Sequence, residues 1–148
     1  MRLLVLAVAL VPWPVLAQDT AVLPVKLLDT SHEARDQRQD HSRRLDLMAQ
    51  TLAGALSADR IAAADVAAAC PRETTDCLVT LLHDRDADRG LFVVVHKTST
   101  LILQVFADLV DVRNEKLVTH AELNFRGDND EGWQRAADYL AGKLAADR

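Results

Sequence analysis

Apolar residues recur at two different periods along this chain of 148 residues. Between Leu45 and Leu56, and again between Trp133 and Leu144, they return every three or four positions, which predicts two amphipathic helices. The first starts at Asp40 or Ser42 and ends near Ser57, and the second ends at about Leu144. Shorter helical patterns cover residues 65–69 and a stretch that begins at residue 75 or 76.

Between these helices the pattern is that of strands. Residues 21–28 are mostly apolar but include Pro24, which indicates a strand end, an edge or a bulge. Residues 91–96 form an apolar, β-branched run typical of a central strand. Residues 101–112 and 117–126 alternate on either side of a turn at 113–116, with Leu117, Thr119, Ala121, Leu123 and Phe125 expected on one face.

This order predicts an α/β fold. We expect one domain over residues 18–148, with a mixed sheet of four to five strands, a C-terminal antiparallel meander and about three helices packed on it. The Ala-rich segment 60–69 is the weakest part of the pattern, and whether it holds a strand stays open.

The amino terminus has the pattern of a secretory signal peptide. Arg2 precedes an apolar run from Leu3 to Val11, and Val15 and Ala17 occupy the −3 and −1 positions of a cut before Gln18. The run is too short to span a bilayer of roughly 30 Å. We therefore expect residues 1–17 to be removed and the remaining chain to be periplasmic, with no transmembrane segment after processing; an uncleaved anchor is the alternative.

The net charge and the two cysteines restrict the classes of function open to this chain. A formal charge of −5 disfavours a nucleic-acid partner, which selects for a basic stripe. Cys70 and Cys77 enclose a polar loop, and in an oxidising compartment we expect them to form an intramolecular disulfide. A redox-active pair is the alternative, but six intervening residues do not match the usual Cys-x-x-Cys spacing. Zinc binding lacks a second pair of ligands nearby.

No catalytic motif is present. The acids at 84–88 alternate as in a calcium loop, but Arg89 stands where that loop has Gly, so a solvated helix end is the preferred interpretation. Asp128 and Glu131 have the spacing of a helix capping box. The sequence contains no phosphate-binding loop, nucleophile elbow or dinucleotide fingerprint. We therefore expect neither an enzyme nor a bound metal or cofactor.

The candidate contact site is a turn beside a strand face. Residues 96–100 join two apolar strands and hold many donors, with Lys97 as an exposed charge, and the solvated face of the last strand lies nearby. The predicted binding residues are His96, Lys97, Ser99, His120, Glu122 and Arg126, with Asn124 between them. Together they offer charge-assisted hydrogen bonds to an envelope protein. The alternative is an ordinary hydrogen-bonded turn beside a solvated sheet surface.

Three segments carry a family resemblance: residues 95–103, residues 110–113, and Phe125-Arg126-Gly127-Asp128-Asn129-Asp130-Glu131-x-Trp133. They resemble a family of uncharacterised exported proteobacterial proteins, a domain of unknown function. The resemblance implies a small periplasmic α/β domain similar in layout to the amino-terminal domain of TolB and to the curli-secretion lipoprotein. It implies envelope assembly and protein contact rather than catalysis, and an accessory role beside a periplasmic quinoprotein dehydrogenase system. It supplies no site residues.

The sequence thus favours a non-catalytic periplasmic binding or accessory protein. The alternative is a small periplasmic enzyme or metal-binding protein that uses His96, His120 and nearby acids. The two hypotheses differ in geometry, since the alternative requires both histidines and a carboxylate within ligand distance in a concave pocket.

Overall fold

A computed structural model of the chain describes residues 19–146, so the predicted signal peptide lies outside the described residues. The elements are β1 (Thr20–Val22), β2 (Lys26–Asp29), α1 (Arg38–Leu56), β3 (Asp59–Arg60), α2 (Ala63–Ala69), α3 (Thr75–Asp84), β4 (Arg89–Lys97), β5 (Ile102–Asp111), β6 (Lys116–Arg126) and α4 (Asp130–Ala146). Within the described range no helix is both long and apolar enough to cross a membrane.

One mixed sheet of six strands organises the domain, with the order β3-β1-β4-β5-β6. Pro24 divides the predicted first strand in two, and both halves, β1 and β2, pair in parallel with β4. The strands β4, β5 and β6 form the predicted antiparallel meander. The α/β class is confirmed; the sheet has one strand more than the upper end of the predicted range, because of this division and the two-residue β3.

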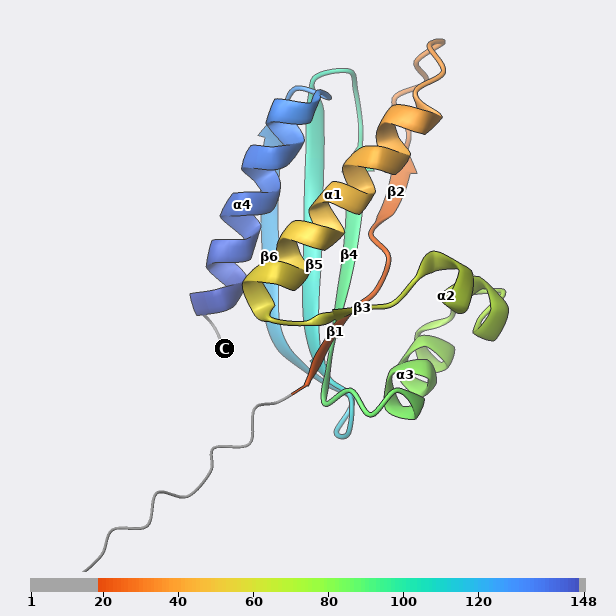
Figure 1. Cartoon of the computed structure of the whole chain (residues 1–148). Helices are drawn as coiled ribbons and strands as arrows, with labels where there is room; N and C mark the ends of the chain where they lie inside the picture. The colour runs from red at the N-terminus through yellow and green to blue at the C-terminus, as the bar shows by residue number, and fades with distance from the viewer. Residues whose placement is uncertain (1–18, 147–148) are drawn as a thin grey trace, which may run out of the picture.

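The two sheet faces differ in how they are covered. Helices α1 and α4 lie side by side across one face (Figure 1), and the main core of buried Leu, Val, Ala, Met48 and Trp133 side chains fills the space between. On the opposite face, α2 and α3 cover only the end near β1 and the start of β4, where a second, smaller core forms. There Leu82 of α3 packs directly on Gly90, where a Cβ atom would clash with the leucine side chain.

No helix among residues 19–146 covers the remainder of that second face. We call it the open face. It consists of the residues of β2, β4, β5 and β6 whose side chains point away from α1 and α4. Four large apolar residues on it are each at least 39% exposed: Leu28, Val94, Ile102 and Leu117. A bulge between Leu109 and Val110 shifts the register, so that Leu117 pairs with Val110. Leu117 therefore belongs to the open face, and the prediction that it shares a face with Thr119 is wrong.

Local contacts and backbone conformation mark the end of α1 and the start of α3. Helix α1 ends at Leu56, followed by Ser57 in the left-handed conformation, close to the predicted end. Thr74 caps α3 by accepting from the Cys77 N–H. The predicted disulfide is confirmed, since Cys70 and Cys77 are bonded and tie the end of α2 to the first turn of α3.

Candidate functional site

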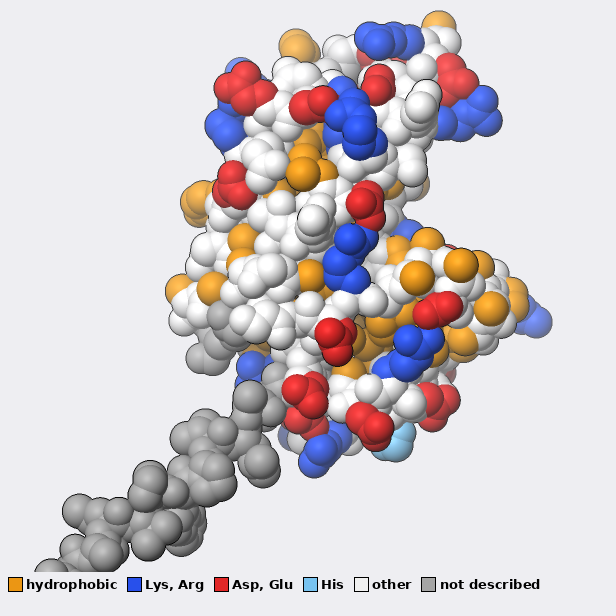
Figure 2. Space-filling view, viewed as in Figure 1, with side chains coloured by type: hydrophobic (Ala, Val, Ile, Leu, Met, Phe, Trp, Pro, Cys, Tyr) orange, Lys and Arg blue, Asp and Glu red, His pale blue; other side chains and the backbone are white. Residues whose placement is uncertain are grey.

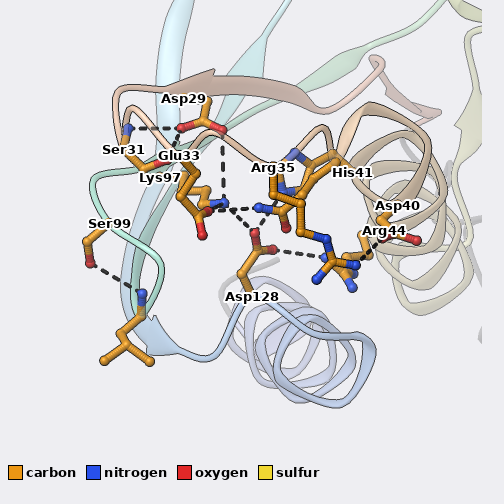
Figure 3. Close-up of polar contacts among 12 residues, drawn as sticks. Asp29, Ser31, Glu33, Arg35, Asp40, His41, Arg44, Lys97, Ser99 and Asp128 are labelled. Atoms are coloured by element: carbon orange, nitrogen blue, oxygen red, sulfur yellow. Dashed lines mark hydrogen bonds and ion pairs between the residues drawn. The ribbon is translucent and has the colours of Figure 1, made fainter.

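A cluster of charged side chains is buried where β4 ends and where α1 and α4 begin (Figure 3). Its centre is the carboxylate of Asp128, whose side chain is only 5% exposed. Oδ2 lies 2.7 Å from Lys97 Nζ and 2.7 Å from His41 Nε2. Oδ1 accepts from Trp133 Nε1 at 2.9 Å and from Arg44 Nη1 at 3.1 Å. We call these five residues the Asp128 cluster.

The members come from the end of β4, the start of α1, the β6–α4 connection and the first turn of α4. Lys97 is the last residue of β4 and continues the row of Leu91, Val93 and Val95 that faces the helices, so its side chain enters the protein. His41 and Arg44 are three apart near the start of α1 and therefore share one side of the helix. The connection from β6 to α4 brings Asp128 between them.

Two glycines shape that connection. Gly127 has a φ of +90°, a conformation that residues with a side chain rarely adopt, and it turns the chain away from β6. A Cβ at Gly132 would lie 2.4 Å from the carbonyl oxygen of Gly127, so the first turn of α4 approaches this connection too closely for any other residue. The side chain of Asn129, not Asp128, accepts the Gly132 N–H, at 2.8 Å. The predicted capping box of Asp128 with Glu131 is therefore wrong, because Asp128 is engaged in the cluster.

The electrostatics of the cluster favour an ionised carboxylate. Burial alone would raise the pKa of Asp128, but hydrogen bonds from Lys97, His41 and Trp133 outweigh it and lower the pKa from 3.8 to about 2. For Lys97, burial alone would lower the pKa, but bonds to Asp128 and Glu33 raise it above its usual value. Because an ionised carboxylate only accepts, His41 Nε2 donates to it.

The cluster also holds the loop that precedes α1. Lys97 Nζ forms an ion pair with the carboxylate of Glu33 and lies 4.0 Å from Asp29 Oδ2. Glu33 in turn accepts from Gln37 Nε2 at 2.8 Å. Among the described residues, no buried side-chain nitrogen or oxygen lacks a hydrogen-bond partner. The cluster therefore uses its donors and acceptors within itself and on its neighbours Glu33 and Asp130, which suits a structural role.

The predicted contact residues divide between the two faces. His96, His120, Glu122 and Arg126 lie on the open face, as expected from strand alternation. Lys97 does not join them: it is fully buried on the opposite face, so the expectation of an exposed charge is wrong. The reason is that adjacent residues of a strand point to opposite sides of the sheet.

Ser99 closes the turn after β4. Its Oγ accepts from the N–H groups of Leu101, at 3.3 Å, and Ile102, at 3.1 Å. The next strand leads from this turn back beside β6, where Ile102 pairs directly with Arg126. The structure therefore brings the turn and Arg126 to the same end of the open face.

His96 and His120 are not brought together. His96 pairs with Gln104, whereas His120 pairs with Asp108, so the histidines are two strands and four residues apart, or about 16 Å. His96 Nε2 lies 2.9 Å from Thr30 Oγ1, and His120 Nδ1 lies 2.6 Å from Asp108 Oδ1. Among residues 19–146, no group of His, Cys, Asp and Glu has an arrangement suited to a metal ion. The geometry that the alternative hypothesis requires is absent there.

Three hollows on the surface lie away from the Asp128 cluster. Figure 2 shows a notch between α1 and α2, about 580 Å³ in volume, with apolar residues of the β1–β2 segment at its base. On the open face, a groove of about 720 Å³ runs between α3 and the β5–β6 hairpin, and an apolar cleft of about 180 Å³ lies between α3 and β2. The Asp128 cluster lines none of these hollows.

Residues 18–144 match the family model DUF3280, described as "Protein of unknown function (DUF2380)". The chain belongs to this family. The match covers nearly all of the predicted mature chain and confirms the resemblance to a domain of unknown function. No curated protein matches the sequence closely enough to serve as a relative.

Solved structures share the fold at low identity. PelC from Paraburkholderia phytofirmans, described as a dodecamer, is 20% identical over 90% of each chain, with a TM-score of 0.52. The lipoprotein GNA1162 from Neisseria meningitidis is 18% identical over 86% of this chain and 96% of its own, with a TM-score of 0.54. TolB from Acinetobacter baumannii is 10% identical over 87% of this chain but 28% of its own, with a TM-score of 0.51. The predicted TolB-like layout is confirmed.

Proposed function

We propose that this chain is an exported, non-catalytic accessory protein of the bacterial cell envelope, and that it binds another envelope protein through the open face. The export pattern in residues 1–17 supports the location, and the family match begins at residue 18, directly after the expected cleavage site. The disulfide between Cys70 and Cys77 fits an oxidising compartment.

The observation that carries the proposal is the half-covered sheet. At the end of the open face away from α3, the apolar side chains of Leu28 and Ile102 are 52% and 47% exposed. They lie beside the donors of His96 and Arg126, since Leu28 pairs with His96, and Ile102 with Arg126. Exposed apolar area interspersed with hydrogen-bonding groups is typical of protein contact surfaces.

A non-catalytic role agrees with the placement of the ionisable groups. Those of the Asp128 cluster are bonded to one another, and the two histidines of the alternative hypothesis lie far apart. The fold is shared with a lipoprotein, with TolB and with a protein that assembles as a dodecamer, which supports assembly within the envelope. The resemblance in sequence makes a periplasmic quinoprotein dehydrogenase system the first class of partner to examine.

The test is a matched pair of double variants used as bait in periplasmic extract. Ile102→Glu with Arg126→Glu changes two exposed, directly paired residues of the open face. Ala67→Glu with Arg72→Glu makes the same changes in charge and polarity on the exposed side of α2 and its following loop. Both variants are expected to melt close to the unchanged protein.

The outcome is read from partners identified by mass spectrometry after crosslinking. We expect the open-face variant to lose a specific envelope protein that the α2 variant still captures. If both variants capture the same proteins in the same amounts, the open face is not the binding surface and the proposal fails.

A further inference from the structure

Within the part of the chain that the structure describes, one long edge of the sheet is covered by no other strand. Strand β6 pairs only with β5 within residues 19–146, and its eleven residues contain no Pro. At the opposite end of the sheet the outermost strand, β3, spans two residues. A long unpaired edge is a template for another strand.

The backbone groups on this edge can be assigned. The Gly127 N–H donates to the Leu101 carbonyl at 3.1 Å, which makes this pair a hydrogen-bonded one. Since hydrogen-bonded pairs alternate along an antiparallel ladder, Phe125, Leu123 and Ala121 also direct their backbone groups toward β5. The intervening residues His120, Glu122 and Asn124 direct theirs outward, away from the sheet.

The side chains at positions 120 and 122 complement one another when two copies of β6 meet. If two β6 strands pair in antiparallel orientation about Ala121, His120 of each copy stands opposite Glu122 of the other in a hydrogen-bonded pair. Each side chain is already oriented by its own chain: His120 Nδ1 lies 2.6 Å from Asp108 Oδ1, and Glu122 Oε1 accepts from Gln104. His120 Nε2 and Glu122 Oε2 remain to meet across the interface.

A hollow lined by apolar side chains and by the two arginines Arg126 and Arg135 continues the same edge. It has a volume of about 270 Å³ and lies between β6 and α4, with Leu123, Phe125, Ala136 and Tyr139 in its lining. Tyr139 is 60% exposed. Counting from the β6–α4 connection, forward along α4 at about 1.5 Å per residue and back along β6 at about 3.3 Å per residue, places Tyr139 level with Glu122, beside the centre of the paired strands.

We propose that two copies of this chain form a symmetric dimer by antiparallel pairing of β6 with β6 about a two-fold axis at Ala121. Each pair of His120 and Glu122 exchanges backbone hydrogen bonds as well as contacting through its side chains. Because both copies use the same edge, and residues 19–146 offer one long free edge, this contact closes on itself and does not propagate into a filament. The dimer is a continuous sheet of two domains, whose helices α1 and α4 lie on one side.

The decisive experiment is a charge-swap cycle on the mature chain, with the dimer dissociation constant measured by analytical ultracentrifugation. Glu122→Lys places Lys opposite His120, and His120→Glu places two Glu residues opposite one another. Each single variant is expected to weaken the dimer about tenfold, because two symmetric pairs change from favourable to unfavourable. The double variant places Glu opposite Lys in both pairs, and we expect it to recover the dimer.

Two controls keep the result interpretable. Asp84→Lys reverses one charge at the exposed end of α3, outside both β6 and α4, and should leave the dissociation constant unchanged. Tyr139→Ala should weaken the dimer, whereas Asp138→Ala, at the neighbouring exposed position, should not. Circular dichroism of every variant checks that it folds.

A chain that stays monomeric at every concentration overturns the proposal. So does a dimer that the single variants leave unchanged, and a double variant that fails to recover the dimer overturns the register. Hydrogen exchange adds an independent measurement: the amides of His120 and Glu122 should become protected as concentration rises, and persistent fast exchange would contradict edge pairing.

Discussion

Replacing Asp128 with Asn tests the Asp128 cluster most directly, because it removes one charge and almost no volume. The carboxylate accepts from four donors, two on each oxygen. An amide nitrogen in place of either oxygen faces two of these donors with a donor of its own. Lys97, fully buried, loses its most buried counter-charge.

We expect Asp128→Asn to lower the free energy of unfolding by about 3–5 kcal/mol, the usual cost of breaking a buried ion pair from one side. For a domain of this size the melting temperature should fall by about 10 °C or more. Urea unfolding followed by circular dichroism measures the change. The control is Asp130→Asn, because Asp130 is mostly exposed although Arg43 and Arg44 bind it, and its loss should be much smaller.

The pH dependence provides a second test of the same carboxylate. Its pKa is about 2 in the folded protein against 3.8 ordinarily, so the folded state binds its proton less readily than the unfolded state. The resulting stabilisation, about 2 kcal/mol, is fully present above about pH 4 and is lost as the pH falls toward 2. The stability difference between the unchanged protein and Asp128→Asn should therefore shrink over that range. A loss below about 1 kcal/mol at neutral pH, or a difference independent of pH, would refute the reasoning.

Further expectations concern the fold and its processing. Gly132→Ala should cost about 2 kcal/mol because its Cβ meets a backbone oxygen, whereas Gly142→Ala, which has open space around it, should stabilise α4 by about 0.5–1 kcal/mol; thermal melting of both variants checks this. Replacing Cys70 and Cys77 by Ser should cost about 2.5 kcal/mol on the chain-entropy model, and an unchanged urea midpoint would contradict it. Amino-terminal sequencing of the exported protein should begin at Gln18, and a retained Met1 would exclude processing.

The hydrophobic periodicity correctly predicted the strands and helices that bury one face and expose the other. The alternation on either side of residues 113–116 gave the β5–β6 hairpin, and the helical stripe from Trp133 gave α4. It failed for Leu117, because a bulge adds one residue and reverses the alternation beyond it. A bulge of this kind depends on the pairing of two strands and leaves no mark in the hydrophobic pattern.

The candidate site was harder to predict than the fold. The alternation through Leu91, Val93 and Val95 places Lys97 on the buried face. Its position in the strand therefore predicts burial, whereas its charge suggests exposure. A buried lysine needs a counter-charge, and its partners Asp128 and Glu33 are 31 and 64 positions away in sequence. Neither partner is marked by any local pattern, since Asp128 has the spacing of a helix cap and Glu33 lies in a polar loop.

The position of the Asp128 cluster limits how variants of the open face can be interpreted. Lys97 follows His96 directly, and Asp128 lies two residues after Arg126, so the buried ion pair holds the backbone from which both outward side chains project. A change at Lys97 or Asp128 would displace the contact surface without touching a partner, and lost binding could then be mistaken for a lost contact. Substitutions confined to outward residues, such as Ile102 and Arg126, avoid this ambiguity because they leave the buried pair intact.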